Sequence, residues 1–436
     1  MTDTGKGALG LPSRLLIDAV AQGLVRFDAA GQIEPGLAER WIVTDGGMSY
    51  IFRLREARWA DGTSVTAEQV ADRLQRQLAP GARNPLAPFL TAVDQVVAMT
   101  PQVVEVQLKR PRPDLLKLFA QPELALLRRG SGSGPLELRE DARTLLLRPL
   151  PDPDSPQVVG PEDQVRLTGE RAALAVARFA AGQTDLVAGG SFADWPLAVR
   201  AQLAAGALRI DPAAGLFGLS IVSRDGFLAD PANRAAVAQA FDRGAITAAV
   251  PGWPATERLL PEQLDSVAPP VSPAWAALPL DQRRAAARAQ VAAWGRPVTL
   301  RLALPAGPGA TELWGQLAGV LRGLGVMPVR VPIAVPADLR LLDAVAPYDS
   351  ARWYLASACQ PCGAAALAAV LAARDASSVA ERAQRIAEAD AAVAADTPFI
   401  PLARPLRWSL VAPRLKAWQP NTRAWHPLNR LRADPT

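Results

Sequence analysis

The chain has 436 residues, of which 50% are hydrophobic and 20% are charged; this is enough apolar material for a packed core and excludes an intrinsically disordered protein. Because a single core stops growing near about 250–300 residues, the length predicts two or three lobes. The 47 basic and 42 acidic residues leave a net charge of +5, and the basic residues are scattered instead of clustered, which argues against a nucleic-acid partner.

The chain has too few cysteines and histidines for the common Cys/His metal sites and for most histidine-based catalytic sites. Cys359, Cys362 and His426 are the only residues of these types, so the chain alone cannot supply a four-ligand Cys/His zinc site. His426 stands between Trp425 and Pro427 in a proline-rich tail, without the sequence signature of a catalytic base. We therefore expect no metal, no cofactor and no enzymatic activity.

The two cysteines have the spacing of a redox motif, Cys-x-x-Cys. No thioredoxin-like βαβ pattern precedes them at the expected place, so a disulfide between Cys359 and Cys362 that staples one loop is the preferred interpretation in an oxidising compartment.

No stretch of 18 strongly apolar residues is present, so we expect no membrane-spanning segment. Residues 1–5 also lack the basic and apolar regions of a secretion signal. Either a leader has been removed or the protein is cytoplasmic.

The first third of the chain predicts strands and a helix. Alternating apolar residues predict strands over 48–55 and 104–108. Between them, Thr66 and Gln69 form a capping box that opens a helix. The glycine-rich segment 130–135 lacks both the lysine of a phosphate-binding loop and the serine of a nucleophile elbow. We expect a linker or a tight crossing there.

The middle of the chain repeats the order strand, helix, strand. A helix is predicted over about 170–181, followed by a strand at 185–187. The pattern restarts with a strand at 216–221 and a helix from Pro231, after the N-cap Asp230, to Ile246. The proline-rich residues 251–281 predict irregular structure.

The clearest βαβ unit follows, which implies a parallel pair of strands. Strands are predicted over 298–304 and 329–333, and Gly325 ends the helix between them. A further helix opens at Ser378 and leads into a strand-like run over 399–411. Together these elements predict two α/β lobes, with the chain crossing between them near residues 215–222 and 397–411.

Several motifs resemble one known family in order and spacing. They are residues 22–27, 35–41, 59–70, 132–135, 230–246 and 396–402. Together they resemble solute-binding protein family 5, the oligopeptide- and dipeptide-binding components of ABC importers.

The resemblance implies an α/β, bilobal periplasmic-binding-protein fold of type II, from the large cluster with an extra subdomain on the first lobe. On this basis lobe I comprises residues 1–28, 134–215 and 412–436, the extra subdomain residues 29–133, and lobe II, with both crossover strands, residues 216–411.

The function that the resemblance implies is solute capture. It implies a periplasmic or otherwise extracytoplasmic protein that binds a peptide-like or other small organic solute in an inter-lobe cleft and delivers it to an ABC permease in the membrane. We expect a monomer that binds no nucleic acid. The alternative is a bilobal ligand-sensing domain of a regulator that is not coupled to transport.

One departure from the family pattern bears on the ligand. Peptide-binding members carry a Trp-x-x-Asp-Tyr-x-x-Pro stretch whose aspartate pairs with the α-amino group of the peptide. The corresponding stretch here is 354–361, with Ser357 in the aspartate position, and a neutral serine cannot balance an ammonium group. Either another acid such as Asp349 substitutes, or the ligand is not a free-amino peptide, which we favour.

The same segment contains the main candidates for ligand contact. Arg352 could clamp a carboxylate or phosphate while Trp353 and Tyr354 stack on an apolar body; alternatively, Trp353 belongs to the core and Arg352 to the solvated surface. The complete set of predicted ligand-binding residues is Gln22, Trp195, Phe217, Arg352, Trp353, Tyr354, Ser357 and Arg404. For Phe217 a role in the hinge core is the stronger interpretation.

Overall fold

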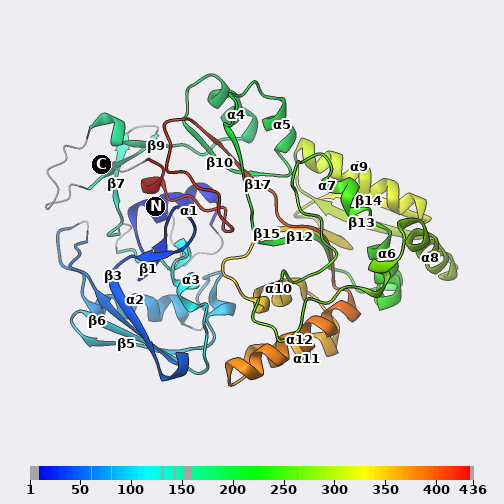
Figure 1. The fold of residues 1–436 in the computed structure, drawn as a ribbon, viewed down its shortest axis with the longest axis horizontal. Coiled ribbons are helices and arrows are strands. Elements are labelled where there is room, and N and C mark those ends of the chain that lie inside the picture. Colours follow the sequence, from blue (N-terminus) through cyan, green and yellow to red (C-terminus); the bar gives the residue numbers. More distant parts are fainter. Residues whose placement is uncertain are drawn as a thin grey trace. The chain divides into compact units, whose positions relative to one another are not determined.

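The computed structural model describes residues 9–59, 61–79, 81–128, 132–141, 144–150, 160–262 and 264–432. The chain forms two compact units, which we call unit 1 (residues 1–174 and 411–436) and unit 2 (residues 175–410) (Figure 1). The features predicted for residues 1–5 and for Gly130 and Ser131 lie outside the described residues.

This division differs from the predicted lobes over residues 175–215, which the resemblance assigned to lobe I. In the structure β10 (Leu186–Ser191) and β11 (Leu208–Asp211) flank β17 (Arg407–Val411) in one three-stranded sheet. Because β17 returns from the end of unit 2, this shared sheet ties residues 186–211 to unit 2.

The described residues of unit 1 form three small sheets. The largest is antiparallel, in the order β3-β4-β6-β5, and α2 packs on β5 and β6. A second pairs β1 with β2, and a third has the order β7-β8-β9. The strands are β1 (Val25–Phe27), β2 (Ile33–Pro35), β3 (Ala38–Thr44), β4 (Ser49–Leu54), β5 (Val93–Thr100), β6 (Val103–Leu108), β7 (Leu136–Asp141), β8 (Thr144–Pro149) and β9 (Val165–Leu167). The helices are α1 (Leu11–Val20), α2 (Ala67–Leu78) and α3 (Leu115–Phe119).

The capping box predicted for unit 1 is present. The Thr66 hydroxyl accepts a hydrogen bond from the Gln69 backbone N–H and begins α2. Val70 and Leu74 of this helix are buried, because residues four apart lie on the same face. The predicted strands at 48–55 and 104–108 correspond to β4 and β6.

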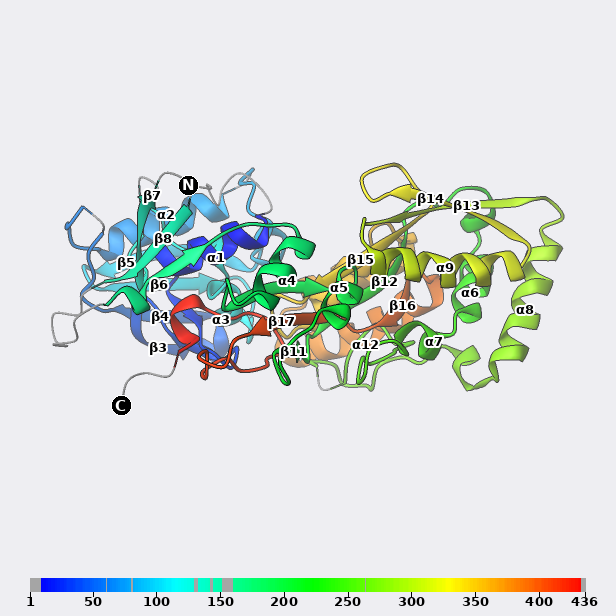
Figure 2. The ribbon, with the colours of Figure 1, turned by 90° about the horizontal axis from the view of Figure 1, so that it is seen from above.

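Unit 2 is built on a five-stranded mixed sheet in the order β14-β13-β15-β12-β16. The predicted βαβ unit is confirmed: β13 and β14 run parallel, and Figure 2 shows the helix that joins them, α9, beside them. All seven residues of β12 are buried, as expected for a strand covered on both faces. The strands are β12 (Gly215–Ile221), β13 (Val298–Leu304), β14 (Val326–Pro332), β15 (Leu339–Val345) and β16 (Phe399–Ala403).

The helices of unit 2 cover these strands in groups. In Figure 1, α10, α11 and α12 lie together beside β12, whereas α6 and α8 pack on each other. The helices are α4 (Ala172–Ala180), α5 (Trp195–Arg200), α6 (Pro231–Ala240), α7 (Arg243–Thr247), α8 (Leu280–Ala293), α9 (Pro308–Gly323), α10 (Ala351–Ala358), α11 (Ala364–Asp375) and α12 (Val379–Asp396); α4 begins within unit 1.

Two predicted elements are each divided in the structure. The helix predicted over 231–246 is wrong as one element, because Phe241 is extended and the Asp242 carboxylate accepts from the Ala245 N–H to start α7. The run over 399–411 forms two strands in different sheets, β16 and β17, with Pro405, which lacks an N–H, between them.

In the parts of the chain that the structure describes, no helix combines the length and the apolar character needed to cross a bilayer.

Candidate functional site

Helix α10 carries four of the predicted ligand-binding residues and is fixed at its N-terminus by charge. The Asp265 carboxylate accepts a hydrogen bond from the Ala351 backbone N–H at 3.0 Å. The same carboxylate forms an ion pair with Arg382 of α12 at 2.6 Å, and Arg382 also donates to the Ser350 hydroxyl. A negative charge at a helix N-terminus is favourable, so Asp265 acts as a cap supplied by a distant segment.

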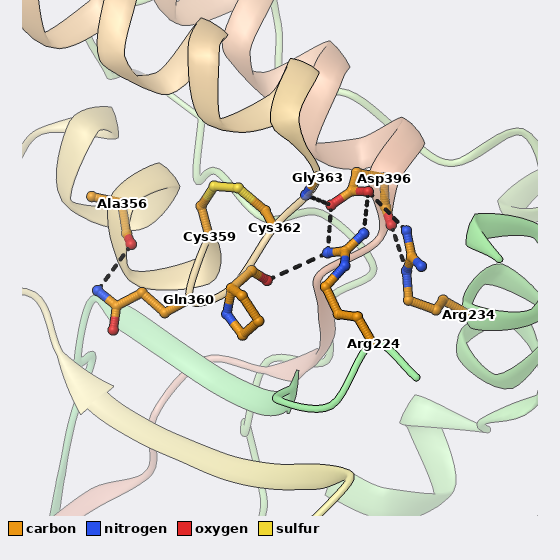
Figure 3. Close-up of a disulfide and its surroundings, with 9 residues drawn as sticks. Arg224, Arg234, Ala356, Cys359, Gln360, Cys362, Gly363 and Asp396 are labelled. Atoms are coloured by element: carbon orange, nitrogen blue, oxygen red, sulfur yellow. Dashed lines mark hydrogen bonds and ion pairs between the residues drawn. A yellow bond between two sulfur atoms is a disulfide. The ribbon is translucent and has the colours of Figure 1, made fainter. Parts of the chain in front are cut away.

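The other end of α10 is fixed by a disulfide. The structure joins Cys359, the C-terminal cap of α10, to Cys362, which comes just before the Gly363 cap of α11 (Figure 3). The loop between the two cysteines therefore links two successive helices.

The loop after the disulfide is held by a group of residues that we call the Asp396 clamp: Arg224, Arg234, Gly363 and Asp396 (Figure 3). The Asp396 carboxylate accepts from Nη1 of Arg224 and from the Gly363 N–H, both at 2.8 Å, and from Nη2 of Arg234 at 2.7 Å. Burial by itself raises the pKa of Asp396, but the bonds from Arg224 and Gly363 outweigh it and hold the pKa below its ordinary value.

A second group lies where β16 ends, and we call it the arginine–aromatic cluster: Phe217, Trp253, Trp353, Tyr354 and Arg404. The Trp253 Nε1–H donates to the backbone oxygen of Arg404 at 2.6 Å. The Trp253 ring packs edge-on against Phe217 at 5.1 Å between centroids. Trp353 and Tyr354 are packed edge-on at 5.0 Å, and the Arg404 guanidinium lies 6.0 Å from the Tyr354 ring centroid.

The charge of Arg404 has little compensation inside this cluster. Its Nη1 donates to the carbonyl oxygens of Gly215 and Leu259 at 3.4 and 3.3 Å, which are long for hydrogen bonds. Burial lowers the pKa of Arg404, and the only opposing electrostatic effect comes from Tyr354. A partly desolvated cation is therefore held beside aromatic rings.

The structure brings some of the predicted site residues together. Trp353, Tyr354 and Arg404 are neighbours in unit 2, and Phe217 joins them through Trp253. Ser357 is half-buried on α10, and Arg352, on the same helix, is only 5% exposed, which excludes the solvated role considered for it.

Two predicted residues do not join the cluster in the contacts that the structure shows. Gln22 belongs to unit 1, where its Nε2 donates to the Ser133 backbone oxygen at 2.5 Å. Trp195 begins α5 and is buried, and its Nε1 has no hydrogen-bond partner among the described residues. Phe217 is completely buried and packs against Phe192, which agrees with the core interpretation.

Sequence reasoning missed two parts of this arrangement. Trp253 stands in the proline-rich region that predicted only irregular structure. The Asp396 clamp unites residues 224, 234, 363 and 396, and their sequence separation gives no pattern that could have found it.

The arrangement is suited to binding. Aromatic rings can cover an apolar body, and a guanidinium can receive a planar anion. Among the described residues no group of three or more His, Cys, Asp or Glu is placed to hold a metal ion.

Comparisons with known proteins agree with this picture. Residues 32–143 match the family described as "Bacterial extracellular solute-binding proteins, family 5 Middle". The "Probable deoxycholate-binding periplasmic protein YgiS" of Escherichia coli is 34% identical over 121 residues, 24% of this chain and 23% of that protein. The periplasmic murein peptide-binding protein MppA of E. coli is 33% identical over 131 residues, 26% of this chain and 24% of that protein. The match thus spans about a quarter of the length of these curated relatives.

The similarity of fold extends much further. The crystal structure of Haemophilus influenzae OppA in complex with RPPGFSPFR superposes with a TM-score of 0.81 at 19% identity, covering 99% of this chain and 95% of that chain. The E. coli murein tripeptide-binding protein MppA gives a TM-score of 0.81 at 20% identity over 99% and 94% of the two chains. The predicted α/β periplasmic-binding-protein fold is confirmed, and the sequence similarity to family 5 of the bacterial extracellular solute-binding proteins extends over residues 32–143.

Proposed function

We propose that the protein is an extracytoplasmic solute-binding protein that captures a peptide-like or other small organic solute and delivers it to an ABC importer. The observation that carries this proposal is the match of residues 32–143 to the binding-protein family. The likeness of fold to peptide-binding proteins along 99% of the chain supports it. The protein acts by binding and not by catalysis, as its similarity to the binding-protein family suggests. Nothing in the comparisons favours the ligand-sensing alternative.

The relatives narrow the kind of solute only partly. MppA is named for a murein peptide and YgiS for deoxycholate, which is not a peptide. In this chain the Ser357 hydroxyl has no hydrogen-bond partner among the described residues and is not closed off from solvent. A neutral hydroxyl can bond a polar solute, but it cannot neutralise the ammonium group of a peptide. We therefore favour a solute without a free α-amino group.

The proposal is tested by releasing bound solute. The protein is purified without added ligand and denatured, and the released small molecules are identified by mass spectrometry, since tight complexes dissociate slowly enough to survive purification. We expect one small organic species, and a strain that lacks the gene should lose uptake of that species.

Two probes make the test decisive when nothing co-purifies. Trialanine, which carries an ammonium group, and deoxycholate, which does not, are titrated calorimetrically into the protein. Saturable binding of either one supports the proposal. Absence of released solute together with no binding of both probes would overturn it.

A further inference from the structure

Arg404 lacks the carboxylate partner that three other inward-facing arginines of unit 2 have among the described residues. Arg234, Arg382 and Arg407 pair with Asp396, Asp265 and Asp343 at 2.7, 2.6 and 2.8 Å. Among the described residues no carboxylate lies within ion-pair distance of Arg404, whose contacts are two carbonyl oxygens and the Tyr354 ring. Removal of a guanidinium from water is unfavourable unless opposite charge or strong acceptors replace the water.

Part of the Arg404 guanidinium is free to bond something else. Only Nη1 has protein acceptors. The Nε and Nη2 atoms have none among the described residues, and they are not among the buried atoms that lack a partner, so they reach solvent. These two N–H groups lie on one edge of the guanidinium fork, which is the edge that binds two oxygens of one planar anion.

The ring that the Arg404 guanidinium contacts is neutral, and so is the next polar side chain on the same side of α10. The aromatic face of Tyr354 lies beside the guanidinium. Three residues further along α10, on the same side of the helix, Ser357 offers a hydroxyl without a hydrogen-bond partner among the described residues. An arginine, an aromatic ring and a hydroxyl together would favour a negatively charged oxygen group and would not favour an ammonium group.

We infer that Arg404 receives an oxyanion of the bound solute, a carboxylate or a phosphate, through its Nε and Nη2 atoms. This inference names the class of solute, and it rests on the proposed function only in treating the anion as part of the cargo. The lowered pKa of Arg404 accords with it, because a desolvated cation gains more from an incoming anion than a hydrated one does.

The test measures anion binding directly on the full chain. Thermal unfolding is followed in sodium acetate, sodium phosphate and sodium chloride at matched ionic strength and pH, so that general screening is the same in each. We expect acetate or phosphate to raise the unfolding temperature above its value in chloride, because an anion that binds only the folded state stabilises it. The anion that gives the larger rise distinguishes a carboxylate from a phosphate site.

Substitution then assigns the effect to a residue. In Arg404→Gln we expect the apparent dissociation constant of the stabilising anion to rise about tenfold or more, because a charge-assisted pair of hydrogen bonds is lost. Arg404→Lys keeps the charge without the fork and should retain part of the effect. The matched control Arg385→Gln removes an exposed arginine of α12 that pairs with Glu388, and it should behave like the unaltered protein.

The inference is overturned by the absence of any difference between the oxyanions and chloride in the unaltered protein, or by an equal difference in Arg404→Gln and the control. If Arg404→Gln does not fold, Arg404→Lys tests the same contact. Lysine lacks the two N–H groups of the guanidinium edge, so an undiminished oxyanion effect in Arg404→Lys would contradict a bidentate contact. An anion effect that depends on Arg404 without any released or bound solute would keep the oxyanion site at Arg404 and reject the proposed function. A released solute without an acidic group would support the proposed function and overturn this inference.

Discussion

Two charged regions of unit 2 differ in how their charge is balanced. At the Asp396 clamp, one carboxylate meets two guanidinium groups and a backbone N–H within 2.8 Å, so every partner of the acid is internal. At the arginine–aromatic cluster, the guanidinium of Arg404 contacts only carbonyl oxygens and a ring among the residues that the structure describes.

The charges of the clamp hold the fold together, whereas the charge of Arg404 is available for a further contact. The clamp joins α6, the segment after β12, α11 and the end of α12. Its charged groups are paired with one another and hold those elements together. Arg404 joins the end of β16 to Gly215 and Leu259 by weak bonds, and most of its hydrogen-bonding capacity is unused. The comparison predicts large effects on stability at the clamp and small ones at Arg404.

The largest effect is expected for Asp396→Ala. This change leaves Arg234, whose side chain is 1% exposed, without its counter-charge, and an unpaired buried charge typically costs about 3–5 kcal/mol. Denaturant unfolding followed by circular dichroism measures the loss. As a control on the same helix, Glu388→Ala removes an exposed pair with Arg385, and it should change stability by under about 0.5 kcal/mol. Equal losses in the two variants would contradict the structural role of the clamp.

Removal of the disulfide comes next. In the chain-entropy model, closure of a four-residue loop by the Cys359–Cys362 bond stabilises the fold by about 2 kcal/mol. The Cys359→Ser/Cys362→Ser variant should lose about that much in denaturant unfolding.

Hydrogen exchange shows where this loss falls. The Asp396 clamp still holds Gly363 and the start of α11 in that variant, so we expect faster amide exchange at the C-terminal end of α10 and little change in α11. Faster exchange confined to α11 would contradict this, because it would mean that the disulfide holds α11 and that the Asp396 clamp does not.

The pH dependence of stability sharpens the description of the clamp. The pKa of folded Asp396 lies below its ordinary value, so the stability that it contributes is complete above the unfolded pKa, about 3.9, and is lost as the pH falls through the folded pKa. Asp396→Asn removes this titration. We expect the difference in unfolding free energy between the two proteins to shrink as the pH is lowered from 6 to 3; a constant difference would show that the carboxylate charge is not what matters.

Sequence patterns predicted the scaffold better than these two regions. The parallel β13–β14 pair, the caps of α2 and α12 and the strands β4 and β6 follow from local periodicity and capping residues. The family motifs gave the fold class, which the likeness to solved structures confirms. Helices, strands and their caps can be predicted in this way because they depend mainly on residues that are close in the sequence.

The site could be predicted only in part, because its contacts join distant segments. Tyr354 and Arg404 were both predicted ligand-binding residues, but nothing local showed that they are neighbours. Asp396 was visible only as part of a strand motif, since its partners Arg224 and Arg234 lie more than 160 residues away. The balance of charge at either region therefore depends on tertiary packing.

Among the changes made within the two regions, Arg404→Gln is expected to have the smallest effect on stability. No ion pair is lost, and the two carbonyl contacts are long, so the unfolding free energy in the absence of ligand should fall by less than about 1 kcal/mol. Arg234→Gln, which leaves the clamp acid short of a partner, should cost several times more. Both variants are measured by denaturant unfolding in chloride buffer. An equal loss of stability in Arg404→Gln and Arg234→Gln would mean that Arg404 holds the end of β16 to Gly215 and Leu259. Arg404 would then have a structural role like that of the clamp, and the difference between the two regions would not hold.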